Sequence, residues 1–418
     1  MDSEPVSVAR VGRSVVLIAM SFLAIAAGGV AYLHPTLPAL NTVAPAAHAP
    51  YHLAAVDFVS PDVGWVVADF EAGDYALLHT IDGGASWTTQ LSAPTGGNQQ
   101  YVKFFDTMAG VFALVGTRPV LNRTTDGGRT WTATPALGTH STVLSWSFVD
   151  SDRGWMLADP DTASRPRLYS TEDGGFTWRD LGSPVADPEV AFGAQFSFLT
   201  TGWLATAGLG PYAFKTGDFG VTWTRVRLPI PAWDVSGGGR FFVDVHQTSS
   251  SGAIASVVYF PEFLGRGGVG GRIRQFPPLA VPFYDGSRPN DYIYSTMIDQ
   301  VVGAPNSAVQ APVYELLRSL DNGATWIAID PPALSGTLGY ATKSSWWWVD
   351  AGAWSNSADG GVTWIRQSGV GLIAPLPGSL QVLDGDHAWF AGVSARALET
   401  TADGGRHWRL VTLPQALT

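Results

Sequence analysis

Cysteine is absent from the 418 residues of the sequence. A disulfide framework, a thiolate metal site and a lipid-modified cysteine are therefore excluded. Charge is also sparse, because Lys, Arg, Asp and Glu make up only 14% of residues. The 24 basic residues are outnumbered by 35 acidic ones, which gives a formal net charge of −11. This balance argues against nucleic acid and against anionic membrane surfaces as partners.

Motifs for cofactors and metals are lacking as well. The segment from Gly265 to Gly270 matches G-x-G-x-x-G, but it lacks the preceding buried strand and following helix of a dinucleotide site, so a flexible glycine loop explains it better. The histidines form no metal pattern, since His34, His48 and His52 fall near the N-terminus and His407 replaces a hydroxyl residue within a repeat. We therefore expect no cofactor, no metal and no catalytic residue.

A repeated motif dominates what is present. The pattern S/T-x-D-x-G-x-(S/T/H)-W occurs seven times, and we call this eight-residue motif the Asp turn. Successive Asp residues are 44, 47, 45, 103, 38 and 44 positions apart. A period of this length on strand-like sequence is typical of propeller blades with four strands each. The sequence thus predicts an all-β fold, a seven-bladed β-propeller of four-stranded antiparallel blades with one long loop insertion.

Each residue type of the motif has a structural reason. The Asp can accept hydrogen bonds from turn N–H groups, the Gly at position five suits a positive φ, the hydroxyls at positions one and seven can tie the flanking strands together, and the Trp can pack between sheets. We therefore interpret the motif as structural rather than catalytic. Its Asp, Gly and Trp residues are Asp82, Gly84, Trp87; Asp126, Gly128, Trp131; Asp173, Gly175, Trp178; Asp218, Gly220, Trp223; Asp321, Gly323, Trp326; Asp359, Gly361, Trp364; and Asp403, Gly405, Trp408.

The position of the motif assigns the two faces of the propeller. A second pattern, an apolar segment followed by Gly and an aromatic or apolar residue, precedes each Asp turn, so a repeat reads strand A, B, C, Asp turn, D. A-to-B and C-to-D connections then share one face, which we call the Asp-turn face, and B-to-C and D-to-A connections share the other, which we call the loop face. The loop face has the longer connections (69–74, 158–167, 183–190, 228–240 and 368–378), so we expect binding there.

The step of 103 residues contains an insertion. We place it at about 260–311, in the B-to-C connection of the fifth blade, where it would extend from the loop face as a lid or partner arm. It is rich in aromatic residues, and the candidate ligand-binding residues are Tyr284, Arg288, Asp291, Tyr292 and Tyr294. The alternative is an eighth, degenerate blade without an Asp turn.

The N-terminus predicts export. Residues 1–13 carry Arg10 and Arg13, and residues 14–33 form an uncharged run long enough to span a bilayer. The positive-inside rule places 1–13 in the cytoplasm and the propeller, 51–418, outside, with 34–50 as a Pro/Ala-rich tether. A cleaved signal peptide is the alternative, because Ala47-His-Ala49 resembles a cleavage site.

The repeats resemble the Asp-box (bacterial neuraminidase) repeat. With its F-x-D and G-W segments, the blade pattern is most similar to the photosystem II stability and assembly factor family, over about residues 51–413 without the insertion. This resemblance implies an extracytoplasmic propeller that acts as a binding scaffold. Two features depart from that family: no arginine-rich patch can be located in the sequence, and the insertion has no counterpart.

Three function classes remain open. The first is a noncatalytic scaffold that binds a protein or peptide, for example in assembly of a membrane or surface complex. The second is a glycosidase or glycan-binding propeller, although the sialidase F/Y-R-I-P motif is missing; its acids would come from Asp69, Glu71, Asp74, Asp159, Asp161, Asp234, Asp285 and Asp291. The third is a metal-stabilised adhesion or receptor domain. Trp346-Trp347-Trp348 fits a sugar platform less well than packing between blades, because alternate strand residues face opposite sides.

Overall fold

A computed structural model describes residues 51–70, 74–94, 99–115, 119–134, 142–159, 165–198, 200–232, 239–261, 313–332, 336–350, 352–375, 379–392 and 397–414. In these ranges the regular structure consists of strands, which form seven four-stranded antiparallel units in chain order. The first four units are β1 (Tyr51–Phe58), β2 (Gly64–Phe70), β3 (Asp74–Thr80), β4 (Thr88–Pro94); β5 (Gln99–Phe104), β6 (Gly110–Val115), β7 (Val120–Thr124), β8 (Thr132–Ala133); β9 (Thr142–Phe148), β10 (Gly154–Asp159), β11 (Arg167–Thr171), β12 (Arg179–Gly182); and β13 (Val190–Phe196), β14 (Gly202–Gly208), β15 (Tyr212–Thr216), β16 (Thr224–Arg227). The last three are β17 (Gly239–Gln247), β18 (Ala253–Pro261), β19 (Val313–Ser319), β20 (Ile327–Ala328); β21 (Thr337–Tyr340), β22 (Trp346–Asp350), β23 (Ala353–Ser357), β24 (Ile365–Gln367); and β25 (Gln381–Val382), β26 (Ala388–Ala391), β27 (Leu398–Thr401), β28 (Arg409–Val411).

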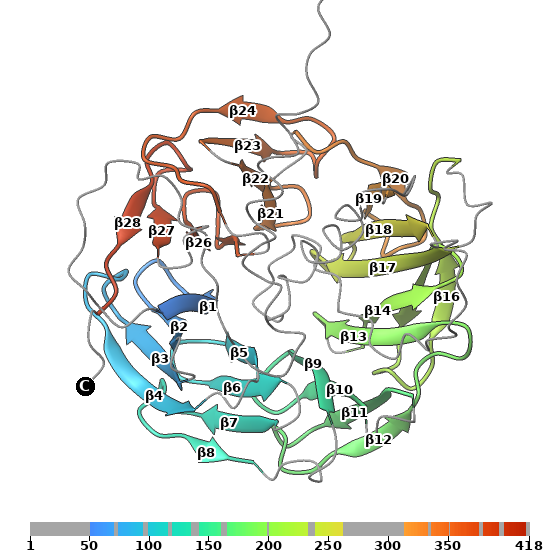
Figure 1. Ribbon diagram of the computed structural model, residues 1–418, viewed down its shortest axis with the longest axis horizontal. Helices are drawn as coiled ribbons and strands as arrows, with labels where there is room; N and C mark the ends of the chain where they lie inside the picture. The colour runs from blue at the N-terminus through green and yellow to red at the C-terminus, as the bar shows by residue number, and fades with distance from the viewer. Residues whose placement is uncertain are drawn as a thin grey trace, which may run out of the picture.

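The units stand around a common axis as the blades of a propeller (Figure 1). The first strand of a unit lies toward the centre and the fourth at the periphery (Figure 1). This arrangement confirms the predicted all-β fold and the strand order A, B, C, Asp turn, D. Residues 262–312 join β18 to β19, two strands that pair with each other. The predicted insertion and the alternative of an eighth blade concern this segment, which lies outside the described residues.

The core lies between the blades. Strand B is covered on both sides, so all seven residues of β14 are buried, whereas the outer strands such as β16 are mostly exposed. Seven clusters of buried apolar side chains each combine residues of two successive units. The three consecutive tryptophans follow this rule: Trp346 and Trp348 pack toward the fifth unit, and Trp347 packs toward the seventh. All three are buried, which confirms the prediction of blade packing.

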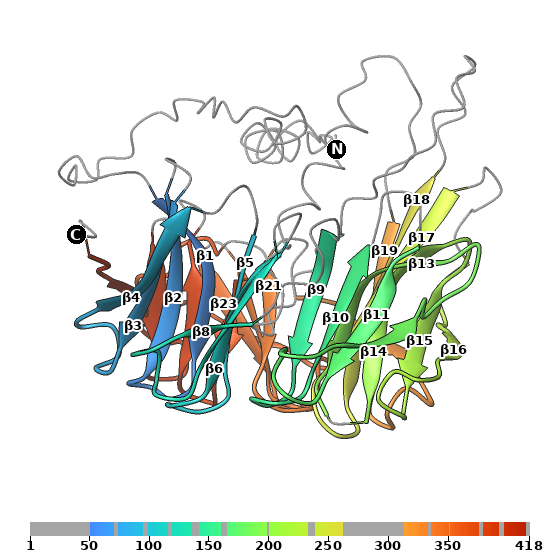
Figure 2. The same cartoon turned by 90° about the horizontal axis from the view of Figure 1, so that it is seen from below.

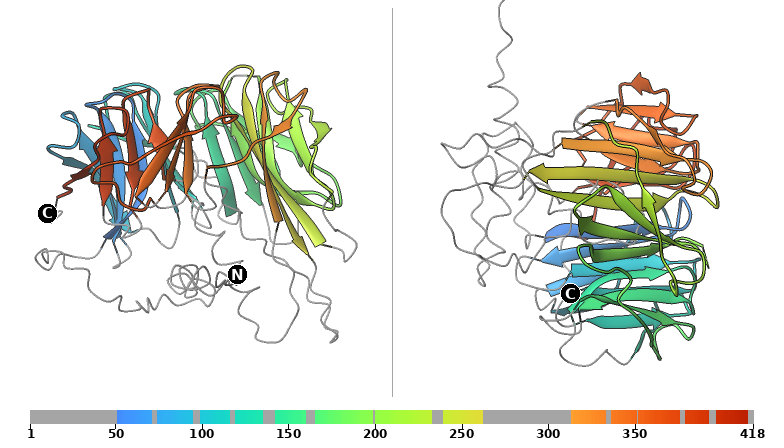
Figure 3. Two further views of the ribbon diagram at one scale, coloured as in Figure 1. Left: turned by 90° about the horizontal axis from the view of Figure 1, so that it is seen from above. Right: turned by 90° about the vertical axis from the view of Figure 1, so that its right-hand side faces the viewer.

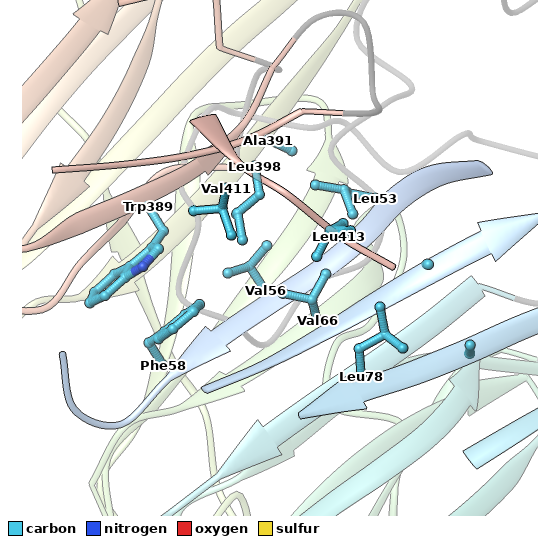
Figure 4. Packing of buried hydrophobic residues seen from close by; sticks show 12 residues of the cluster. Leu53, Val56, Phe58, Val66, Leu78, Trp389, Ala391, Leu398, Val411 and Leu413 are labelled. Atoms are coloured by element: carbon cyan, nitrogen blue, oxygen red, sulfur yellow. The ribbon is translucent and has the colours of Figure 1, made fainter. Parts of the chain in front are cut away.

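The first unit (β1–β4) and the last unit (β25–β28) are separate four-stranded sheets that share no strand. The ring is therefore closed by contacts between their side chains. Phe58 stacks on Trp389 at a centroid distance of 4.2 Å, and Val56, Leu398 and Val411 fill the same contact (Figure 4). The Gln381 side chain adds polar contacts: its Oε1 accepts a hydrogen bond from Phe58 N at 2.8 Å. Packing of this kind holds the ring without an exchanged strand.

Close contact explains the Gly of the second sequence pattern. In the first four units, the Phe at the end of strand A lies against the first Gly of strand B, as Phe58 does against Gly64. A Cβ at that glycine would collide with the ring. The same phenylalanine meets the Trp of its own Asp turn edge-on, with Phe58 and Trp87 at 6.4 Å and 88°. The Phe and Gly of the second pattern and the Trp of the Asp turn therefore pack together in each of these blades.

The fourth and fifth blades are joined more closely than the others. In β14, Thr206–Gly208 pair with Phe241–Val243 of β17, so the two sheets share backbone hydrogen bonds. Strands β17 and β18 have nine residues each, and they extend beyond the ring on the side opposite the Asp turns (Figures 2 and 3). Among the described residues, no helix has the length and apolar character needed to cross a membrane. Residues 14–33, the predicted anchor, lie outside the described ranges.

Candidate functional site

The seven Asp turns share one hydrogen-bond pattern. In the first, Asp82 Oδ1 accepts bonds from Thr80 Oγ1 and Ser86 N at 2.8 Å each, and Oδ2 accepts one from Ser86 Oγ at 2.6 Å. Thr80 Oγ1 also accepts a bond from Gly84 N at 2.8 Å, and Trp87 Nε1 donates to Gly84 O at 3.2 Å. We expected the two hydroxyls to tie the flanking strands, but both donate to the carboxylate of Asp82 instead.

These hydrogen bonds keep the Asp residues ionised. Bonds from Ser86 and Thr80 lower the pKa of Asp82 to about 2, and bonds from Thr325 and Ser319 do the same for Asp321. In the last turn, His407 takes the role of the hydroxyl residue, with Nδ1 at 2.6 Å from Asp403 Oδ2. A carboxyl with so low a pKa carries no proton near neutral pH and cannot act as a general acid. The geometry therefore agrees with the structural interpretation of the motif.

The residue at position four of each turn fixes the two faces. Its N–H donates to a carbonyl of the A-to-B connection in the same blade, as Gly83 N does to Asp62 O at 2.9 Å. The other six pairs are Gly127 with Met108, Gly174 with Asp152, Phe219 with Thr200, Asn322 with Ser251, Gly360 with Ser344, and Gly404 with Asp386. The A-to-B and C-to-D connections thus lie side by side on the Asp-turn face, as predicted.

Sequence reasoning missed a belt of bonds between blades on this face. In six of the seven turns, a carbonyl at position three or four accepts a bond from a long side chain of the preceding unit. The donors are Arg409 to Gly83 O, Gln90 to Gly127 O, Arg123 to Asp173 O, Trp155 to Phe219 O, Lys215 to Asn322 O, and Arg318 to Gly360 O. Four residue types perform one task, so no repeated letter could reveal it in the sequence.

The predicted ligand-binding residues Tyr284, Arg288, Asp291, Tyr292 and Tyr294 lie outside the described residues and stay a prediction. Of the acidic residues considered as glycosidase candidates, some lie within the described ranges and others do not. Glu71, Asp161, Asp234 and Asp285 fall outside the described ranges. Asp69 pairs with His52 at 3.2 Å, Asp74 is exposed at the start of β3, and Asp159 ends β10. Asp69 and Asp74 lie on the paired strands β2 and β3 of the first blade, whereas Asp159 lies in the third blade.

The best-defined part of the loop face is the connection 183–189 between β12 and β13. Arg165 Nη1 donates to Val185 O at 3.0 Å, and the same guanidinium pairs with Asp187. At the other end, Glu189 is buried and pairs with Arg225 Nη2 at 2.7 Å. Val185 is buried beneath the connection. Side chains from two blades therefore hold this loop in one shape.

An aromatic ring completes the arrangement. The Arg225 guanidinium lies 3.5 Å from the centroid of the Tyr212 ring, a cation–π contact. The nearby connection between β14 and β15 presents Leu209, whose side chain is 62% exposed. Arg165 and Arg225 are 60 positions apart in the chain, so their meeting at one loop could not be predicted from the sequence. We call 183–189 together with Arg165, Leu209, Tyr212 and Arg225 the blade-four platform.

Two carboxyls near the loop face have raised pKa values. Burial raises the pKa of Glu399, on β27, to about 7, and Ile373 N donates to its Oε2 at 3.4 Å. Burial also raises the pKa of Glu315, on β19, and the charge of Asp330 adds to this effect. Glu399 is 3% exposed and cannot contact a ligand, whereas Glu315 is only half-buried. Within the described ranges, His and acidic side chains form no group that could hold a metal ion.

No family model and no curated protein matches the sequence. Solved structures do match, among them YCF48 bound to D1 peptide (18% identity, 75% of this chain and 82% of that chain, TM-score 0.44) and YCF48 from Cyanidioschyzon merolae (15%, 86% and 96%, TM-score 0.45). The GH74 xyloglucanase from Xanthomonas campestris also matches (13%, 86% and 72%, TM-score 0.30). The chain is thus similar to YCF48 at 15–18% sequence identity. Similarity of this degree transfers neither a partner nor an activity.

Proposed function

We propose that this protein is a noncatalytic scaffold that binds a protein or peptide segment on its loop face. The observation that supports this most is the blade-four platform, in which Arg165 and Arg225 hold a loop from two different blades. Loops held by a rigid scaffold lose little conformational entropy on binding, so they favour association. The exposed Leu209 side chain supplies an apolar contact next to this loop.

The charges near this face also fit binding better than proton transfer. Four carboxylates are already paired with arginine, as Asp350 is with Arg366 at 2.9 Å. The other three pairs are Asp180 with Arg167, Asp187 with Arg165, and Glu189 with Arg225, and Asp69 contacts His52. A general acid must deliver its proton to the substrate, whereas these carboxylates are already engaged by other side chains of the protein. The paired carboxylates are thus suited to orienting a partner.

Photo-crosslinking tests this proposal. A benzoylphenylalanine in place of Leu209, in the full chain in its native cells, is expected to give one discrete crosslinked protein. Leu410, which is 61% exposed on the outer strand β28, provides the control position. Products from Leu209 that are absent from Leu410 support the loop face as the binding site. Identical products from both positions, or none from Leu209, contradict it.

A second candidate function, a carbohydrate-active propeller, rests on Glu315. Burial and the charge of Asp330 raise its pKa, and a raised carboxyl pKa is one property of the general acid of a glycosidase. If the protein hydrolyses glycans, Glu315→Gln is expected to abolish hydrolysis and Asp330→Asn to shift its pH optimum. A wild-type protein that is inactive on a panel of β-glucans and sialosides removes this candidate.

We also propose that residues 14–33 anchor the propeller to a membrane, with the propeller on the extracytoplasmic side. The uncharged run and the basic residues before it support this orientation. Protease added to intact cells should then digest the propeller, and the protein should remain in the membrane fraction after a carbonate wash. A mature protein that begins after Ala49 and stays soluble would instead show a cleaved signal peptide.

A further inference from the structure

The Asp-turn face has an apolar region on three successive blades. Five large side chains there are between 39% and 53% exposed: Phe176 in the third blade, Phe198, Phe219 and Val221 in the fourth, and Leu320 in the fifth. We call them the apolar tips. Hydrogen bonds connect these blades: Phe219 N donates to Thr200 O within the fourth blade, Trp155 Nε1 of the third blade donates to Phe219 O, and Lys215 Nζ of the fourth blade donates to Asn322 O of the fifth. The tips therefore lie on neighbouring turns of one surface.

Phe219 is the most informative of them because its backbone is in the left-handed region, at φ 65°. It occupies position four of its turn, where five of the other turns have glycine at φ 67° to 73° and the sixth has Asn322 at φ 59°. A bulky residue in this conformation is strained. Its ring is nevertheless 45% exposed, so burial offsets little of that strain. An exposed aromatic side chain at a position that favours glycine indicates a role outside the fold.

The surroundings of the tips are acidic. The six A-to-B and C-to-D connections of blades three to five contain one basic residue, Arg153, which pairs with Asp150. Two further basic side chains reach these connections from neighbouring strands: Arg123 pairs with Asp152, and Lys215 Nζ donates to Asn322 O. The connections contain six acidic residues: Asp150, Asp152, Glu172, Asp173, Asp218 and Asp321. Bonds from Thr222 and Thr325 lower the pKa values of Asp218 and Asp321, so both stay charged. The surface thus combines apolar side chains with negative charge.

The negative charge around the apolar tips determines which kinds of partner can bind there. A second copy of the chain, joined through the same surface, would bring two acidic rims together, and an anionic membrane would present charge of the same sign. We propose that the apolar tips dock a protein segment in which large apolar side chains are flanked by Lys or Arg. Aromatic and aliphatic anchors within a polar rim are the usual composition of such contacts. With the loop face, the propeller then has two docking surfaces on opposite sides of its ring.

This proposal can be tested by selecting peptides that bind the full chain from a phage-displayed library of random dodecapeptides. The expected peptides combine aromatic or aliphatic residues with Lys or Arg, and their affinity should weaken roughly tenfold or more in Phe219→Gly. The matched control is Ile81→Thr, which removes an equally apolar and 69% exposed side chain from the Asp turn of the first blade. This control should leave binding unchanged. Raising the salt concentration should weaken binding of the wild type.

Phe219→Gly also separates binding from folding, because it installs the residue that most of the other turns use. The melting temperature of Phe219→Gly should equal or exceed that of the wild type. The same is expected for Phe219→Asn, because the turn of the fifth blade has Asn322 at this position. A clear fall in melting temperature for both variants would mean that the ring supports the fold, which overturns the proposal. Selection of no peptides, of acidic peptides, or of peptides that bind Phe219→Gly and the wild type equally well also overturns it.

Discussion

Replacing Trp326 by alanine is expected to lower the free energy of unfolding by about 3–5 kcal/mol. The Trp326 side chain is 8% exposed and lies between the fourth and fifth blades, where it meets Trp203 edge-on at 5.8 Å. Its Nε1 also donates to Gly323 O at 3.1 Å. The substitution thus opens a cavity at a junction between blades and leaves the turn carbonyl without this donor. Urea denaturation followed by circular dichroism measures the effect.

The control for this prediction is Trp326→Phe. It keeps most of the buried apolar area and removes the indole N–H, so the expected loss is about 1 kcal/mol. If alanine and phenylalanine have the same small effect, the Trp of the Asp turn does not hold adjacent blades together. The Trp residues of five other turns are partly exposed, and their replacement should cost less than that of Trp326.

Glu399→Gln is expected to stabilise the protein at pH 8 and to have little effect at pH 4. Burial raises the pKa of Glu399 from 4.5 to about 7, so the folded protein binds the proton more tightly than the unfolded chain. The stability of the wild type therefore falls as pH rises from about 4.5 to 7, by an amount on the order of 3 kcal/mol. Glutamine resembles the protonated form and removes this dependence.

Urea denaturation of both proteins between pH 4.5 and 8 tests the prediction. The Asp turns do not interfere in this window, because their lowered pKa values change stability only below the ordinary value of 3.8. The two curves should meet near pH 4.5 and separate above it. Parallel curves would show that the Glu399 carboxyl has an ordinary pKa in the folded protein.

The fold could be predicted because it repeats. Seven copies of Asp, Gly and Trp at a nearly constant period determined the strand order, the two faces and the packing of Trp between blades. The Asp turn needs these residue types for local reasons, positive φ and a carboxylate within reach of two hydroxyls, so the sequence alone reveals them. The alternation of Trp346, Trp347 and Trp348 was predictable for the same reason, since it follows from strand geometry.

The candidate sites could not be predicted because they depend on residues that are distant in the chain. Arg165 and Arg225 meet the loop 183–189 from two different blades. The side chains that donate to an Asp-turn carbonyl from the preceding blade vary in residue type, so the sequence shows no repeated pattern at these positions. Phe219 did have a signal in the sequence, a Phe where most copies have Gly, but its significance became evident only with its φ angle and exposure.

The central claim is that the Asp turns build the scaffold and the loop face binds the partner. The most direct test compares Thr171→Val and Leu209→Asp for melting temperature and for binding of the protein crosslinked at Leu209. Thr171 is buried, and its hydroxyl accepts a bond from Gly175 N at 2.8 Å, so valine should cost about 1–3 kcal/mol while Thr171→Ser should not. The account predicts that Thr171→Val lowers the melting temperature and leaves the folded fraction able to bind, whereas Leu209→Asp melts normally and does not bind. A Thr171→Val variant with unchanged melting temperature that no longer binds the protein crosslinked at Leu209 would contradict it.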